Sequence, residues 1–305
     1  MKFDWEFNHL GMMVTNRDEI LAYYQSIGLG VSVGPQPLLP FVEGDGEITF
    51  FRELEGDPIS HKYKTGGIHN FKDGQSQIGN CQLEIYPMKP GPGMFISRYL
   101  EKKGDGINHI AFNTNDIEKD TQYFLDRGCD LVFNVTTNGK TMENYIDTRL
   151  HGDLMISLRP PADDWEKSWR KNNESHPLVN QWNFLGLGIC VDDLESASSY
   201  YSDLGYTKIN NAIKKKEWRA IYQEFSLGGV LFELIESKEE SIYSDSLKRR
   251  GDGVAEIIFE VSDIGKEIDR LIVKGTQILQ FSDDEKMVSI QSGLKGNILT
   301  RLIEK

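Results

Sequence analysis

The sequence predicts an α+β fold in which four βαβββ units form two tandem domains with mixed sheets. Four segments share one plan, in which an apolar strand, a polar turn, a helix and a glycine are followed by about three strands. The chain of 305 residues also has room for about two domains of roughly 150 residues each. An internal repeat of this length indicates an architecture built from equivalent units.

The four copies begin and end alike. They begin with NHLGMMVTNRDEILAYYQSIGLG, NHIAFNTNDIEKDTQYFLDRGCDLV, FLGLGICVDDLESASSYYSDLGYTKI and AEIIFEVSDIGKEIDRLIVKGTQIL, and they close on GNCQLEIYP, GDLMISLRP, GGVLFELIE and GNILTRLIE. An aspartate at the helix N-cap and a glycine at the helix end recur in three of them. These residues are Asp116, Asp193 and Asp263 for the caps, and Gly128, Gly205 and Gly275 for the ends.

The spacing of the copies predicts the domain boundaries. Two copies fall within residues 1–160 and two within residues 178–305. The segment between them, residues 161–177, is polar and contains proline, so we expect a linker. A short helix is expected in it around Trp165 and Trp169.

Composition excludes several classes of partner. The formal net charge is −13 and no basic run occurs, which argues against nucleic acid and against an anionic membrane surface. No apolar run approaches the roughly 20 residues that span a bilayer, and the acidic N-terminus lacks the apolar stretch of a signal peptide. The widely spaced Cys81, Cys129 and Cys190 predict buried free thiols in a reducing cytosol. A cytoplasmic protein is therefore expected.

Candidate metal ligands lie on three strands of similar character. The stretch LEIYPMKPGPGMFISRYLEKKGDGINHIAF begins with a strand carrying Glu84, continues through an amphipathic helix over residues 94–103, and ends in a strand carrying His109. The repeat-equivalent strand near the N-terminus carries His9. One carboxylate and two imidazoles are the groups that a divalent metal needs.

Strand alternation supports this placement. Side chains two residues apart share one face of a strand. One face of the Glu84 strand then carries Gln82, Glu84 and Tyr86, and the other carries Cys81, Leu83 and Ile85. We expect the polar face to line a cup. Two histidines at the same place in two repeats favour a site over isolated strand polar groups.

The repeat resembles the vicinal oxygen chelate superfamily, also called the glyoxalase/bleomycin-resistance fold, over nearly the whole chain. The stretch from Leu83 to Phe112 most resembles methylmalonyl-CoA epimerase, with the same order of glutamate-bearing strand, proline turn, I-x-x-[FY]-L-x-K helix, glycines and His-Ile-Ala strand. The resemblance implies two tandem glyoxalase-like domains, each with a cupped sheet that can hold a metal. Tandem double domains also resemble extradiol dioxygenases and 4-hydroxyphenylpyruvate dioxygenase.

The resemblance implies four ligand positions in each domain. They fall on His9, Glu84, His109 and Ser157 in the first domain, and on Gly186, Glu233, Glu256 and Arg301 in the second. The first domain thus keeps three metal ligands, His9, Glu84 and His109, and Ser157 is expected to hydrogen-bond a water or substrate. The second domain is a degenerate copy in which Arg301 is expected to pair with the glutamates, without a metal.

Imidazole and carboxylate ligands suit Fe, Zn, Ni, Co or Mn, and an open position marks a catalytic site. We expect a small-molecule substrate that is anionic or carries vicinal oxygens, and a homodimer is one assembly that the resemblance allows. The implied function is epimerase, isomerase or lyase chemistry through a metal-stabilised enolate, with Glu84 and Ser157 as catalytic residues. The alternatives are a non-haem Fe(II) dioxygenase using a 2-His-1-carboxylate triad, and a non-enzymatic small-molecule binding or resistance protein. The insertion ISHKYKTGGIHNFKDG is expected to be a loop over the cup.

Overall fold

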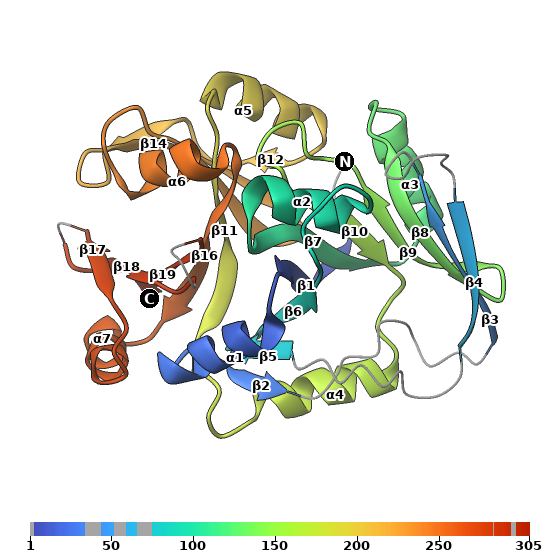
Figure 1. The fold of residues 1–305 in the computed structure, drawn as a ribbon. Helices are drawn as coiled ribbons and strands as arrows, with labels where there is room; N and C mark the ends of the chain where they lie inside the picture. The colour runs from blue at the N-terminus through green and yellow to red at the C-terminus, as the bar shows by residue number, and fades with distance from the viewer. Residues whose placement is uncertain (1–2, 34–43, 52–58, 66–74, 283, 294–296) are drawn as a thin grey trace.

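The chain folds into two large mixed sheets flanked by helices (Figure 1). The structure is a computed structural model, and it describes residues 3–33, 44–51, 59–65, 75–282, 284–293 and 297–305. The first half contains β1 (Trp5–Val14), β2 (Val31–Val33), β3 (Gly44–Phe50), β4 (Ile59–Thr65), β5 (Gln75–Ile78), β6 (Cys81–Pro87), β7 (Gly106–Thr114), β8 (Leu131–Thr137), β9 (Lys140–Ile146) and β10 (Met155–Arg159). The second half contains β11 (Asn183–Cys190), β12 (Thr207–Lys208), β13 (Ile213–Lys215), β14 (Ala220–Leu227), β15 (Val230–Glu236), β16 (Gly253–Val261), β17 (Ile278–Phe281), β18 (Met287–Gln291) and β19 (Leu299–Glu304). The helices are α1 (Arg17–Ser26), α2 (Phe95–Lys103), α3 (Ile117–Leu125), α4 (Asp164–Glu174), α5 (Leu194–Asp203), α6 (Ile242–Arg250) and α7 (Ile264–Val273).

The strand orders confirm the predicted tandem α+β fold. The first sheet runs β2-β5-β6-β1-β7-β10-β9-β8-β3-β4, and the second runs β12-β14-β15-β11-β16-β19-β18-β17 with β13 beside β14. The central strands correspond one to one, because β6-β1-β7-β10 in the first sheet matches β15-β11-β16-β19 in the second. Figure 1 shows the two sheets side by side, with the first half in blue and green and the second in yellow to red.

Strand registers reproduce the predicted equivalence of the repeats. On β1, Gly11 lies opposite Glu84 of β6 and His109 of β7. On β11, Gly188 lies opposite the two residues at the same positions, Glu233 of β15 and Glu256 of β16. Glu84 and His109 in the first sheet therefore occupy the same strand positions as Glu233 and Glu256 in the second.

Helix caps are those that the sequence predicted. The side chains of Asp116, Asp193 and Asp263 each accept a hydrogen bond from the backbone N–H three residues later, at the starts of α3, α5 and α7. The glycines after these helices have positive φ angles, a backbone conformation that favours glycine. The helix expected in the linker is α4, and α2 begins one residue after the predicted start. Helix α6, the counterpart of α2, was not predicted from the sequence.

The insertion was predicted wrongly in part. Residues 59–65 form β4, which pairs with β3, and β3 pairs in turn with β8 of the second unit. This hairpin extends the first sheet at the edge shown on the right of Figure 1. The alternation in ISHKYKT is that of a strand, and the exposed Lys62 fits an edge strand, which charge protects from further pairing. His69, in the same insertion, lies outside the described residues.

One hydrophobic core runs through both halves. It includes Leu10 and Met12, which lie on one face of β1, and Leu83 and Ile85, which lie on one face of β6. It continues into the second sheet and the helices behind it, where Leu187 and Phe259 belong to the same cluster. The face of β6 that carries Glu84 is therefore the face turned away from this core, as strand alternation predicted.

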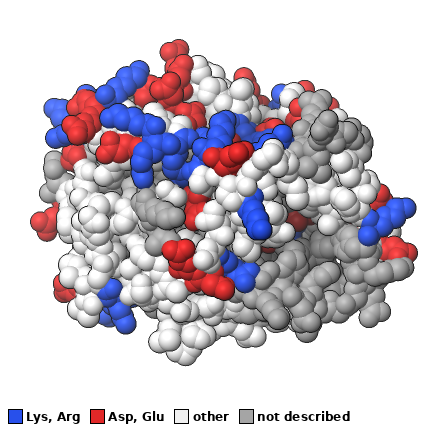
Figure 2. All heavy atoms as spheres, viewed as in Figure 1, with Lys and Arg blue, Asp and Glu red and all other residues white. Residues whose placement is uncertain are grey.

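Basic side chains gather where α2 and α6 end. The last turns of these helices carry Lys102, Lys103, Lys248, Arg249 and Arg250, and Figure 2 shows lysine and arginine side chains over this part of the surface. Cations at helix C-termini complement the helix dipole. Arg250 also accounts for part of the contact between the halves, because it donates to the backbone carbonyl of Lys103.

Within the described ranges, no helix is long and apolar enough to span a bilayer.

Candidate metal centre

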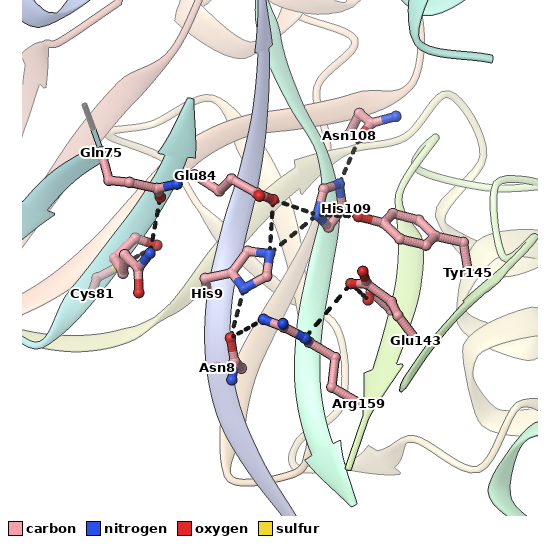
Figure 3. A network of polar contacts seen from close by, with 12 residues as sticks. Asn8, His9, Gln75, Cys81, Glu84, Asn108, His109, Glu143, Tyr145 and Arg159 are labelled. Atoms are coloured by element: carbon pink, nitrogen blue, oxygen red, sulfur yellow. Dashed lines mark hydrogen bonds and ion pairs between the residues drawn. The ribbon is translucent and has the colours of Figure 1, made fainter. Parts of the chain in front are cut away.

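The three residues predicted as metal ligands lie together on the cup face of the first sheet. Nε2 of His9 lies 3.1 Å from Oε2 of Glu84 and 3.3 Å from Nε2 of His109, and the distance from Nε2 of His109 to Oε2 of Glu84 is 3.6 Å. All three side chains are buried. Figure 3 shows them converging from β1, β6 and β7 on one point.

A glycine makes this convergence possible. Gly11 lies between the strands that carry Glu84 and His109, and the His109 imidazole lies directly over it. A Cβ atom at Gly11 would come within 1.8 Å of Cε1 of His109, so any side chain there would displace the ring. The equivalent Gly188 makes room for Glu256 in the same way. The repeated Leu-Gly of NHLGMM and FLGLGIC was a visible sign of this requirement.

Both imidazoles are oriented by the asparagine that precedes them. Nδ1 of His9 lies 2.6 Å from Oδ1 of Asn8, and Nδ1 of His109 lies 2.8 Å from Oδ1 of Asn108. An amide oxygen only accepts hydrogen bonds, so each Nδ1 carries the proton and each Nε2 presents a lone pair. A hydrogen bond from the ring nitrogen that does not face the metal is typical of metal-ligating histidines. The hydroxyl of Tyr145 lies on the other side, 3.1 Å from Nε2 of His109.

The linker helix α4 fixes the orientation of Asn8. Glu166 accepts from Nδ2 of Asn8 at 2.9 Å, and Arg170 donates to Oδ1 of Asn8 at 2.6 Å. Asn113 accepts a second bond from Nδ2 at 2.7 Å. These partners distinguish the two ends of the amide, and so they determine which nitrogen of His9 is protonated. A segment that the sequence predicted to be a linker with a short helix thus controls the chemistry of the candidate site.

The arrangement fits a divalent cation. The two Nε2 atoms and Oε2 of Glu84 are all acceptors, and three acceptors this close repel one another unless a positive charge lies between them. Bonds of about 2.0–2.2 Å from a metal to N and O ligands would give ligand–ligand separations of roughly 3.0–3.5 Å, close to the observed spacing. In the part of the chain that is described, this is the one group of at least three His, Cys, Asp or Glu residues that could hold a metal.

Protonation states agree with this chemistry. Burial lowers the pKa of His9 to about 4, although the charge of Glu84 acts in the opposite direction. Burial acts to raise the pKa of Glu84, but the two histidines outweigh it and hold that pKa well below its usual range. At neutral pH the site therefore offers a neutral imidazole and a carboxylate, the forms that bind metal.

The metal-free protein should lose stability as the pH falls from 6.5 to 4. In this window the unfolded chain protonates His9 while the folded chain does not, so the free energy of unfolding should fall by about 3 kcal/mol. Urea unfolding at pH 7 and pH 4.5 in the presence of a chelator measures this change. In His9→Gln the loss should be smaller by that amount. An equal loss in the variant and the wild type would show that His9 does not titrate as described.

Ser157, at the fourth predicted position, lies beside the three residues but contacts a different carboxylate. Its hydroxyl donates to Oε1 of Glu143 on the neighbouring strand β9 at 2.7 Å. The same oxygen lies 3.9 Å from Nε of Arg159. Burial raises the pKa of the Glu143 carboxyl, against the opposing charge of Arg159. Neither Glu143 nor Arg159 was predicted as a site residue.

The second cup is closed by its own side chains. Arg301 forms ion pairs with Glu233 and with Glu256, the latter at 3.2 Å, as the sequence predicted. Burial acts to lower the pKa of Arg301, but the two glutamates raise it well above its usual range. The fully buried Tyr243 donates to the carboxylate of Glu256, and the fully buried Trp218 packs on Tyr243.

Comparisons with known proteins agree with the tandem fold. Residues 187–286 match the family model of the Glyoxalase/Bleomycin resistance protein/Dioxygenase superfamily. A substituted form of 4-hydroxymandelate synthase from Streptomyces coelicolor is similar in structure over 100% of this chain and 93% of its own, with a TM-score of 0.64 and 14% sequence identity. No curated protein matches the chain in sequence.

Two methylmalonyl-CoA epimerases are similar over a shorter part. The enzyme from Mycobacterium tuberculosis matches 40% of this chain and 87% of its own, with a TM-score of 0.36 and 22% identity. The Streptomyces coelicolor enzyme, in complex with 2-nitronate-propionyl-CoA, matches 40% of this chain and 96% of its own, with a TM-score of 0.36 and 18% identity.

Proposed function

We propose that this chain belongs to the glyoxalase, bleomycin resistance protein and dioxygenase superfamily and is a divalent-metal-dependent enzyme that acts on a small oxygenated substrate by metal-stabilised enolate chemistry. The observation that carries the proposal is the group of three acceptors, Nε2 of His9, Nε2 of His109 and Oε2 of Glu84, which face one another at 3.1–3.6 Å. His9, Glu84 and His109 would hold the metal. A divalent ion bound there supplies a Lewis acid that stabilises negative charge on a substrate oxygen.

The charges around the site favour an anionic substrate. The network around the site contains the carboxylates of Glu84, Glu143 and Glu166 and the guanidinium groups of Arg159 and Arg170. These groups nearly balance, and a divalent cation would leave a net positive charge. In a buried site of low dielectric, that excess attracts an anion or a developing oxyanion. This class of substrate agrees with the one that the sequence predicted.

A non-haem Fe(II) dioxygenase is the second candidate. Two imidazoles and one carboxylate with open positions are the ligand set that such enzymes use. Against it stands the location, because the resemblance places the working metal of the tandem dioxygenases in the C-terminal domain, where this chain has Arg301. A non-enzymatic binding protein ranks third, because a binding role alone does not require three metal ligands. The homodimer and the cytoplasmic location expected from the sequence remain predictions.

Metal analysis tests the proposal and separates the candidates. Protein purified without a His-tag and without chelator should contain close to one equivalent of a transition metal, or take it up on titration. Zn, Ni, Co or Mn would favour proton-transfer chemistry, and Fe would favour the dioxygenase. A protein that binds none of these metals would contradict both enzymatic proposals.

A further inference from the structure

The carboxylate of Glu143 lies beside the candidate metal centre without belonging to it. Residues 145 and 157 face each other across β9 and β10, and residue 143 is two positions from residue 145 on the same face of β9. Tyr145 on that face reaches Nε2 of His109 at 3.1 Å, so the face is turned to the cup. Figure 3 shows Glu143 and Tyr145 side by side, next to Arg159 and His109.

Glu143 does not lie where it could be a fourth metal ligand. The atoms of His9, Glu84 and His109 that could bind an ion lie within 4.8 Å of one another, and Glu143 is not in that group. Its Oε1 is held instead by Ser157 at 2.7 Å and by Arg159 at 3.9 Å. Both contacts use the same oxygen, which leaves Oε2 for a substrate. The carboxylate is 5% exposed, so little water competes for it.

We propose that Glu143 is the general base of this site, and that Ser157 is the residue that positions it; this inference rests on the proposed function. With a metal held by His9, Glu84 and His109, the C–H bond of the hydroxyl-bearing carbon beside the carbonyl would break, its electron pair would move toward the carbonyl oxygen, and the proton would form an O–H bond with Glu143. Glu143 would then return this proton to the former carbonyl carbon while the hydroxyl proton moves to the former carbonyl oxygen. The hydroxyl and carbonyl groups exchange places, so no oxidant or reductant is needed. Burial, which favours the protonated form of Glu143, brings this base closer to the range in which proton transfer is efficient.

The position of Glu143 narrows the substrate class. Among the described residues, Glu143 is the carboxylate on the cup face of β9 and β10, which follow the His109 strand in the sheet. On the other side of the cup, Glu84 is assigned to the metal. A single base that removes and returns a proton from one side suits a transfer between adjacent carbons. We therefore assign the site to an isomerase whose substrate is an anion with a carbonyl next to a hydroxyl-bearing carbon, rather than to an epimerase with two bases.

Proton counting in a binding experiment tests this role without knowledge of the substrate. The probe is acetohydroxamic acid, which is neutral at pH 7 and loses a proton when it chelates a metal. Titration calorimetry of the Zn²⁺-loaded protein, in buffers of different ionisation enthalpy, gives the number of protons released per probe bound. The wild type should release about one proton fewer than Glu143→Gln, because Glu143 captures it. Glu143→Gln should bind Zn²⁺ with unchanged affinity, and Ser157→Ala should give an intermediate proton count.

The outcomes are distinguishable. Equal proton release from the wild type and Glu143→Gln would overturn the base assignment while leaving the metal centre intact. Loss of Zn²⁺ in Glu143→Gln would make Glu143 a ligand, which also overturns the inference. Failure of the wild type to bind Zn²⁺, or of the loaded protein to bind the probe, would contradict the open metal site of the proposed function itself. Far-ultraviolet circular dichroism confirms that each variant is folded, and Glu143→Asp, which keeps a carboxylate but shortens its reach, should also release more protons than the wild type.

Discussion

Replacing His109 with alanine is expected to remove all stabilisation of the protein by divalent metal. Metal that binds only the folded state should raise the free energy of unfolding of the wild type by about 2.7 kcal/mol at a hundredfold excess over Kd. His109 supplies one of three converging atoms, and Glu84 and His9 alone would leave a weak two-ligand site. Melting temperature with and without metal, together with metal affinity by titration, measures the effect.

Ser157→Ala is the matched control for this change. Ser157 is buried on the same face, but its hydroxyl contacts Glu143 and not the three acceptors. We expect this variant to keep its metal affinity and its metal-dependent rise in melting temperature. Loss of metal as complete as in His109→Ala would mean that four side chains bind the ion, and the open position would not exist.

Replacing Arg301 with methionine should destabilise the second half by about 3–5 kcal/mol, because removing one partner leaves buried charges uncompensated. Arg301 is fully buried and pairs with Glu233 and Glu256, whose carboxylates would then face each other without a cation. Denaturant unfolding of the metal-free protein gives the change in free energy.

A second variant separates charge from packing. Adding Glu233→Gln and Glu256→Gln to Arg301→Met removes the uncompensated charges, so much of the lost stability should return. If the triple variant is as unstable as Arg301→Met, the loss comes from the shape of the guanidinium in the core. A loss below about 1 kcal/mol in the single variant would show that the ion pair is not important for stability.

The sequence predicted those parts of the site that depend on the repeat. His9, Glu84 and His109 could be found because strand alternation and equivalent positions constrain them together, and the structure brings them within 3.1–3.6 Å of one another. The Asn-His pair that occurs twice, at residues 8–9 and 108–109, was visible but not interpreted. It sets the protonation of both rings.

The missed residues depend on contacts that a local pattern does not contain. Glu143 reaches the site only through the register of β9 against β10, and one step of register would turn it to the other face. Arg170 and Glu166 act on Asn8 across more than 150 positions of sequence, from a helix whose location no periodicity reveals. Their polar character alone predicted a linker.

The pairing of β3 with β8 has a consequence for the order in which the chain can fold during synthesis. The β3–β4 hairpin, within residues 44–65, acquires its neighbouring strand only when residues 131–137 have left the ribosome. The first strand, β1, pairs with β6 of its own unit but gains its second neighbour only with β7. Contacts between such distant segments form slowly, and unpaired edges promote aggregation in the meantime. The first βαβββ unit is therefore not a module that can fold by itself, and the nascent chain must remain open until the second unit is complete.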